Sequence, residues 1–270
     1  MIIDFHTHAF PDTLAPRAMS SLITNSNNFF PAHTDGTVKG LKENMQKAGI
    51  DISVLQPVIT KPSQTRTLNE WAKSVQDDKI IAFGGVHPDT DDYKRDIDFI
   101  CDLGLKGLKF HAEYQNFFVD EPRMLKIYDY AFSKGLIILH HAGYDPAFEN
   151  PNRATPERFQ KVARAMQGGT LVVAHLGGQS QWDDVEKYLV GENVYLDTSM
   201  GFWLYSKEQF LRIYQGHSAK KLLFGSDTPW SDSKLEVDLF NAIPMPKEDK
   251  ELIFSSNAKR LLGLSTTETI

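Results

Sequence analysis

The sequence contains a single cysteine, Cys101, so no disulfide can form within the chain. A lone thiol fits a reducing compartment, where disulfides are rare. The chain also lacks any apolar run close to the ~20 residues that span a bilayer, and its N-terminus lacks the basic and apolar regions of a secretory signal. We therefore expect a cytoplasmic protein with no membrane partner.

The sequence has no run of Lys or Arg, and its 35 acidic residues outnumber the 29 basic ones, giving a formal net charge of -6. This balance argues against nucleic acid as a partner and favours a small-molecule substrate. Hydrophobic residues make up 41% of the chain and charged residues 24%, a composition typical of a globular protein with a sizeable core. The oligomeric state stays open, with a homo-oligomer among the alternatives.

Eight short runs of apolar residues recur along the chain, and a segment with helix signals follows each of them. The runs occupy residues 1–8, 52–58, 79–88, 105–111, 136–143, 170–178, 193–199 and 221–229. Between them, Thr37 and Gly49 enclose one predicted helix, and Thr155 and Ser206 have the side chains and positions of N-caps. Strands that alternate with helices pair in parallel, because a parallel neighbour needs a long crossover connection.

Eight strand–helix units in a chain of this length predict an α/β fold, the (β/α)8 TIM barrel. The main alternative is an open doubly wound sheet, which would carry a glycine-rich phosphate loop after its first strand. Residues 6–13, HTHAFPDT, contain no glycine, and this disfavours the open sheet. Since no interdomain linker is visible, we predict one domain over residues 1–270.

Seven of the nine histidines lie at the ends of predicted strands: His6, His8, His87, His111, His140, His141 and His175. In a barrel, the C-terminal strand ends build the active site. His6 and His8 are two residues apart on a strand, so both rings face the same side and can share one ion. His141 and Asp227 would complete the ligand shell of a catalytic metal. Taken singly, each histidine is more simply explained by a hydrogen bond to a loop.

The sequence resembles the metal-dependent amidohydrolase superfamily, especially the branch that includes aminocarboxymuconate semialdehyde decarboxylase. The resemblance rests on IDFHTH (3–8), GLKGLKFH (104–111), ILHHAG (138–143), VVAHLGG (172–178), VYLDTS (194–199), LLFGSDTPW (222–230) and NAKRLLGL (257–264). It implies a divalent metal held by His6, His8, the strand-five histidine and Asp227. It also implies His175 beside the metal, as an acid/base group or a ligand of a second ion.

Two positions need interpretation. His140 and His141 are adjacent and must point in opposite directions on a strand, and the family pattern favours His141 as the ligand. His140 would then be a satisfied structural residue that faces the helix layer or the neighbouring strand. Lys109 corresponds to the lysine that bridges two ions in binuclear members, although one ion is expected in this branch. Lys109 could instead pair with a substrate carboxylate or with Asp227, or extend past the barrel rim.

The resulting hypothesis is a metal-dependent hydrolase that cleaves a C–O or C–N bond with a metal-activated water. Asp227 would act as the base, and His175 would stabilise the oxyanion or move a proton. The alternative keeps the same site but has it decarboxylate an aromatic or enol-type acid. A barrel that binds metal or ligand without catalysis is a third interpretation, and the complete ligand set disfavours it.

The substrate is expected to be small and to carry a carboxylate or an aromatic group. Candidate contacts come from strand ends and from aromatic loops. They are Lys109, His111, Arg153, Phe117, Tyr144, Trp203 and Trp230. Arg153 could hold an acid by a bidentate contact. Zinc is the expected ion, although several divalent metals accept such ligands.

Residues from about 10 to 36 form a connection that is long for a barrel and rich in Asn, Ser and Pro. Loops of this length are commonly functional lids or else disordered. The segment leaves the strand that carries the histidine pair, so it starts over the mouth of the barrel. We expect a lid-like insertion with Phe29, Phe30 or His33 near the substrate; a surface excursion or a dimer contact is the alternative.

Overall fold

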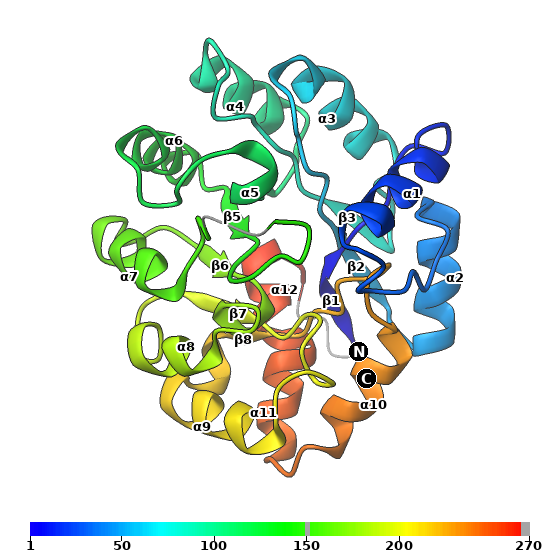
Figure 1. Ribbon diagram of the computed structural model, residues 1–270, viewed down its shortest axis with the longest axis vertical. Helices are drawn as coiled ribbons and strands as arrows, with labels where there is room; N and C mark the ends of the chain where they lie inside the picture. Colours follow the sequence, from blue (N-terminus) through cyan, green and yellow to red (C-terminus); the bar gives the residue numbers. More distant parts are fainter. Residues whose placement is uncertain (149–151, 266–270) are drawn as a thin grey trace.

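Figure 1 shows the computed structural model, which describes residues 1–148 and 152–265, as a ring of helices around a core of strands. The strands are β1 (Ile3–Thr7), β2 (Ile52–Leu55), β3 (Ile80–Ala82), β4 (Gly107–Phe110), β5 (Ile137–His140), β6 (Leu171–Val173), β7 (Tyr195–Asp197) and β8 (Leu222–Leu223). Each of the eight predicted strands is confirmed.

Backbone hydrogen bonds join two parallel sheets, β1-β2-β3 and β4-β5-β6-β7-β8, along both of their edges. On one side, Phe5 N donates to Phe224 O at 2.8 Å. On the other, Lys109 N donates to Gly84 O at 2.9 Å. These bonds close the strands into the (β/α)8 barrel that the sequence predicts.

The helices are α1 (Ala15–Asn25), α2 (Val38–Ala48), α3 (Thr65–Ser74), α4 (Tyr93–Asp102), α5 (Ala112–Gln115), α6 (Pro122–Ser133), α7 (Pro156–Ala165), α8 (Trp182–Tyr188), α9 (Lys207–His217), α10 (Ser233–Ala242), α11 (Lys247–Glu251) and α12 (Asn257–Leu262). Most of them surround the strands as an outer layer, but α12 lies behind the middle of the ring (Figure 1), where Ala258 and Leu262 pack with the barrel interior. Shorter turns are η1 (Pro62–Gln64), η2 (His175–Gly177), η3 (Ala219–Lys221) and the π-helical η4 (Leu252–Ser256). In the described part of the chain, no helix has both the length and the apolarity to cross a membrane.

The predicted helix ends agree with the structure. Thr37, Thr155 and Ser206 each accept a hydrogen bond from a backbone N–H in the first turn of the helix that follows. Gly49 ends α2 with a φ of 72°, the left-handed conformation that glycine adopts without strain. The local signals that predicted these helices therefore act through specific hydrogen bonds and backbone angles.

A register shift in β1 determines where its side chains point. The pairing with β2 shifts between Asp4 and Thr7, which places one extra residue in β1. Phe5 packs in the barrel interior against Phe83, and its neighbour His6 also points inward, toward the mouth of the barrel. Two consecutive side chains on one face require such a bulge, a device often found beside active sites.

The loops after β5 and β6 are joined through Gly143, which pairs with Gln179. Gly143 has a φ of +83°, and a Cβ atom placed there would lie 2.1 Å from Gln179 N. Only glycine fits this approach, since a methyl group would push apart the two loops that carry His141 and His175.

We expect Gly143→Ala to lower the free energy of unfolding by more than ~3 kcal/mol, because it adds a backbone collision to an unfavourable φ. Gly135 is a matched control, since its φ is +76° and a Cβ atom there would meet nothing within 4 Å. Gly135→Ala should cost only about 1 kcal/mol. Urea unfolding of both variants measures the difference, and equal losses would contradict the role given to Gly143.

Candidate metal centre

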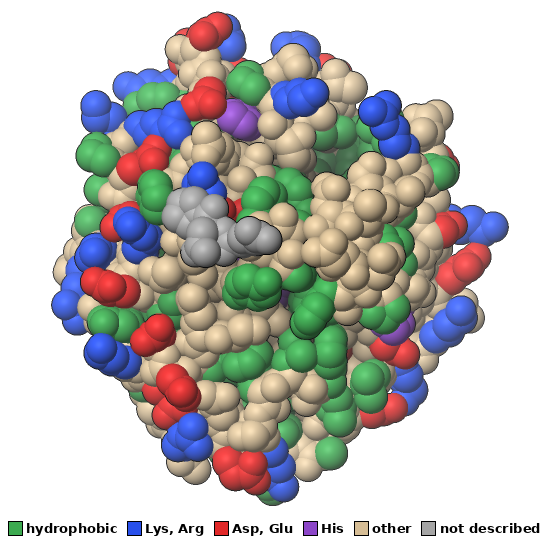
Figure 2. Space-filling view, viewed as in Figure 1, with side chains coloured by type: hydrophobic (Ala, Val, Ile, Leu, Met, Phe, Trp, Pro, Cys, Tyr) green, Lys and Arg blue, Asp and Glu red, His purple; other side chains and the backbone are tan. Residues whose placement is uncertain are grey.

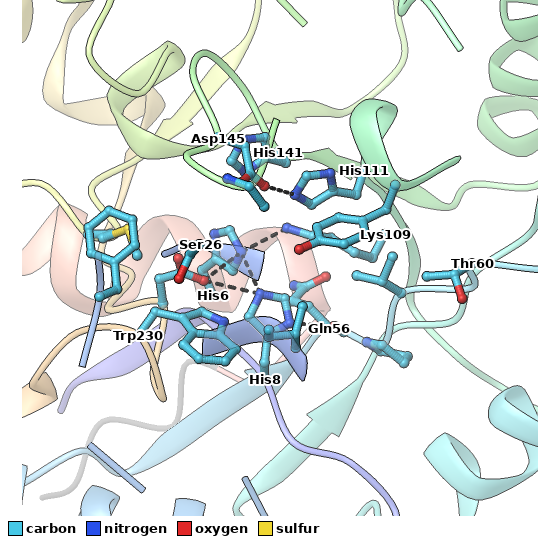
Figure 3. Close-up of a pocket in the computed structure, with 18 of the residues that line it drawn as sticks. His6, His8, Ser26, Gln56, Thr60, Lys109, His111, His141, Asp145 and Trp230 are labelled. Atoms are coloured by element: carbon cyan, nitrogen blue, oxygen red, sulfur yellow. Dashed lines mark hydrogen bonds and ion pairs between the residues drawn. The ribbon is translucent and has the colours of Figure 1, made fainter. Parts of the chain in front are cut away.

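A pocket of ≈ 200 Å³ opens at the C-terminal ends of the strands. The side chains at its polar end are His6, His8, Gln56, Lys109, His111, His141, His175, Gln179 and Asp227. Figure 3 shows several of them converging from different strands. Barrel closure therefore brings together residues that are more than 200 positions apart in the sequence.

Three potential metal-ligand atoms, from His6, His8 and Asp227, lie within 3.4 Å of one another. His6 Nε2 is 3.2 Å from His8 Nε2, and Asp227 Oδ1 is 3.4 Å from the first and 3.1 Å from the second. All three atoms belong to one cluster that could hold a metal ion. The predicted pairing of His6 and His8 with Asp227 is thus present in the geometry.

The other ring nitrogens of the two histidines fix their tautomers. His8 Nδ1 lies 2.7 Å from the carbonyl oxygen of Gln56, which can only accept, so this nitrogen carries the proton. His6 Nδ1 lies 3.0 Å from Asp197 Oδ2, an ionised carboxylate that likewise accepts. Both Nε2 atoms therefore present lone pairs beside Asp227, as metal-ligating histidines do when a second group holds their other nitrogen.

The charges of these groups also suit a cation. Burial, with a further contribution from Lys109, lowers the pKa of His6 to about 4, which keeps the ring neutral. Burial opposes ionisation of Asp197 and Asp227, but nearby histidines outweigh it. The pKa of Asp197 falls to about 2, and that of Asp227 falls below its usual range. Neutral imidazole and ionised carboxylate are the forms that bind metals.

Lys109 reaches this cluster from β4 and does not extend past the rim. Its side chain is 1% exposed, and its Nζ lies 2.8 Å from His6 Nε2 (Figure 3). Burial lowers the pKa of Lys109 to about 8, while Asp227 and Asp197 oppose that effect. An ammonium group drawn to these lone pairs indicates that the cluster attracts positive charge.

His141 faces the pocket but lies apart from the other three residues. Its Nδ1 is 3.0 Å from His175 Nε2, and His175 Nδ1 is 3.2 Å from the carbonyl oxygen of Ser199. Because that carbonyl must accept, the direction of the chain is set: His175 donates to Ser199, and His141 donates to His175. His141 Nε2 is left as a buried lone pair without a hydrogen-bond partner among the described residues.

His140 faces the helix layer, packed among aromatic rings. Its ring stacks on Phe110 at 5.1 Å and meets Tyr128 and Phe159 edge-on. The expectation of a satisfied structural histidine is wrong in one respect: neither ring nitrogen has a partner in the described part of the chain. Burial lowers the pKa of His140 far below its usual value, so the ring stays neutral.

A second histidine–carboxylate pair lies across the pocket. His111 Nε2 is 3.1 Å from Asp145 Oδ2, and the His111 ring stacks on His141 at 4.1 Å. Asp145 comes from the loop after β5, and no periodic pattern in the sequence places it at the site.

Asp197 was not predicted from the sequence either. This residue ends β7, and side-chain alternation from the inward Tyr195 would have predicted that Asp197 faces the pocket.

The structure places two of the expected aromatic contacts, Tyr144 and Trp230, in the lining of the pocket. Three other expected contacts lie elsewhere. Phe117 is 1% exposed and packs on Phe110 in the helix layer, and Trp203 packs on Phe30 outside the lining. Arg153 forms an ion pair with Glu113 and does not belong to the lining.

The insertion at 10–36 contains α1 and contributes Phe10, Leu22 and Phe30 to the lining. Phe29 is 59% exposed and does not line the pocket. His33 is also absent from the lining, and its backbone N–H donates to Pro229 O. Of these three residues, only Phe30 lines the pocket.

Solved structures of similar fold include an uncharacterized TIM-barrel protein from Bordetella bronchiseptica, with a TM-score of 0.76, 22% identity, and coverage of 97% of this chain and 98% of that one. A 5-carboxyvanillate decarboxylase from Novosphingobium aromaticivorans, solved with manganese, has a TM-score of 0.76 at 16% identity, covering 98% and 96%. A Pseudomonas putida protein named for 2-pyrone-4,6-dicarboxylic acid hydrolysis has a TM-score of 0.67 at 15% identity, covering 98% of each chain.

A search of the curated proteins found no match to this sequence. The sequence pattern of one family, described as amidohydrolase, matches residues 3–264. That range contains every residue of the metal-ligand cluster and all eight strands. This chain therefore belongs to the amidohydrolase family.

Proposed function

We propose that this chain is a metal-dependent hydrolase that cleaves a C–O or C–N bond of a small substrate. The observation that carries the proposal is the convergence of His6 Nε2, His8 Nε2 and Asp227 Oδ1 at the floor of a pocket, with both rings held in the ligating tautomer. Membership of the amidohydrolase family agrees with this chemistry.

The residues fit a single divalent ion. His6, His8 and Asp227 would supply three ligands, and the orphaned Nε2 of His141 would supply the fourth. Imidazole nitrogen with one carboxylate suits zinc, the ion we propose, although manganese is bound in one structure of similar fold. The ammonium group of Lys109 beside His6 favours one ion over two, because it already brings positive charge there.

When bound, the ion would lower the pKa of a water and polarise a carbonyl group. Asp227 stays ionised, so it is able to accept the proton of the attacking water and pass it to the leaving group. His175 is oriented by Ser199 and lies beside the proposed ligands. Because its Nε2 accepts from His141, His175 would first take up a proton at Nε2 and then donate it to the developing oxyanion or pass it on. Asp197 and Gln56 keep the histidine rings in place.

A second candidate is decarboxylation of an aromatic or enol-type acid by the same site. Lys109 favours it, because a buried ammonium group at the polar end of the pocket could pair with the substrate carboxylate. Several structures of similar fold are decarboxylases of 2,6-dihydroxybenzoate or 5-carboxyvanillate.

We further propose one domain over residues 1–270, a cytoplasmic location, and a lid formed by residues 10–36.

The two reactions differ in what they release. A panel of esters, lactones, amides and hydroxybenzoic acids should give acid, alcohol or amine from the first three classes, measured by proton release and mass spectrometry. Carbon dioxide from the hydroxybenzoic acids, with no turnover of the other classes, would assign the second candidate and overturn hydrolysis.

Asp227→Asn should lower kcat by roughly 10²- to 10⁴-fold, because the amide cannot accept the proton. The fold should persist, since the side chain keeps its size, and circular dichroism checks this. Asp238→Asn, on the exposed face of α10, is the control and should leave kcat unchanged. Near-native rates in Asp227→Asn would contradict its assignment as the base.

The adjacent histidines allow a matched test of the fourth ligand. His141→Phe keeps a ring but removes the buried Nε2, so we expect metal affinity to fall by more than ~100-fold, beyond the usual loss when a supporting residue is removed. His140→Phe should keep the metal, because its ring nitrogens have no partner among described residues and its neighbours are aromatic. Metal content by mass spectrometry after dialysis measures both, and equal contents would remove His141 from the ligand set.

A further inference from the structure

The pocket extends well beyond the strand ends. Its lining continues from the loops after β1 and β2 to α1 and α3, where Leu68 and Trp71 belong to the outer helix layer (Figure 1). We call this part the apolar arm. Its side chains are Phe10, Pro11, Leu22, Phe30, Pro57, Val58, Leu68 and Trp71, with two hydroxyl groups, Ser26 and Thr60.

No charged side chain lines the apolar arm within residues 1–148 and 152–265. Over the same residues, no arginine lines any part of the pocket, and Lys109 is its one ammonium group. That group lies at the polar end, 2.8 Å from His6 Nε2. A second anionic group on a substrate would therefore lose its hydration in the arm without gaining a partner, which is costly.

Exposed aromatic side chains adjoin the lining at Phe30. Phe30 meets Phe29 edge-on at 4.7 Å and Trp203 at 5.9 Å, and these two partners are exposed. Figure 2 shows hydrophobic side chains gathered near the middle of the same face of the molecule. An exposed apolar patch beside a pocket typically marks a binding surface.

We propose that the substrate has one hydrolysable carbonyl group and an uncharged apolar chain, and that the chain lies in the apolar arm between α1 and α3. This inference rests on the proposed function for the placement of the carbonyl group. It separates the substrate from compounds with a second carboxylate at the far end of the chain, because Lys109 and the proposed metal ligands all lie at the polar end of the pocket. The depth of the arm selects for length, and its lack of charge selects against acids at the far end.

The first test uses products in place of substrates. Tryptophan fluorescence, reported by Trp71 and Trp230 in the lining, follows binding of n-alkanoates from butanoate to decanoate to the metal-loaded protein. The dissociation constant should fall roughly two- to fourfold per added methylene. α,ω-Dicarboxylates of equal length should bind at least about tenfold more weakly. A constant affinity across the series, or dicarboxylates that bind equally well, would overturn the proposal.

Two variants test the position of the arm. Leu68→Arg and Leu22→Arg place a guanidinium on α3 and on α1, so each should reverse the preference and favour the dicarboxylate. Leu235→Arg, at an exposed leucine of α10, is the matched control and should leave the preference unchanged. Thermal unfolding identifies any variant that fails to fold, and the other then decides. Wild-type selectivity in a folded variant would overturn the proposal.

Turnover of a homologous series of alkyl esters separates this inference from the proposed function. Metal-dependent hydrolysis that is indifferent to chain length would overturn the inference and leave the hydrolase assignment in place. Chain-dependent binding of alkanoates, with no hydrolysis of any ester, lactone or amide, would support the apolar arm and overturn the hydrolase assignment.

Discussion

The site depends on two hydrogen bonds made away from the pocket, from His6 Nδ1 to Asp197 and from His8 Nδ1 to the carbonyl of Gln56. Each bond holds a proton on one nitrogen and thereby keeps a lone pair on the other. Asp197 comes from β7 and Gln56 follows β2, so residues from two other strands fix the rings of His6 and His8. Ligation is therefore a property of the closed barrel, because no single strand–helix unit carries both a ring and its anchor.

Local sequence signals were sufficient for the fold. The signals that predict strands and helix ends act within a few residues, so they can be recognised from the sequence alone. They are the apolar runs, N-caps such as Thr37 and left-handed glycines such as Gly49. The pairing of His6 with His8 follows from strand periodicity, and barrel closure then brings Asp227 beside them. The bulge in β1 has no sequence signal, since it depends on the register of the neighbouring strand.

The side chains that reach the pocket from loops were harder to predict. Aromatic loops suggested contacts, yet Phe117 turns into the helix layer and Trp203 onto Phe30. Arg153 was expected to bind an acidic substrate, but it forms an ion pair with Glu113. These two residues are 40 positions apart in the sequence. Loop geometry and long-range ion pairs have no period, which is why Asp145 was missed and these three were misplaced.

The burial of Lys109 beside the ligand cluster has a consequence for how the protein matures. The ionised carboxylates of Asp197 and Asp227 would repel each other inside the barrel if they had no positive neighbour. The ammonium group of Lys109 offsets that repulsion before any metal ion binds. The polypeptide can therefore reach its native state first and acquire metal afterwards, unlike small zinc domains that are unfolded without their ion. The choice of metal then belongs to the cell's supply of free ions at that later moment.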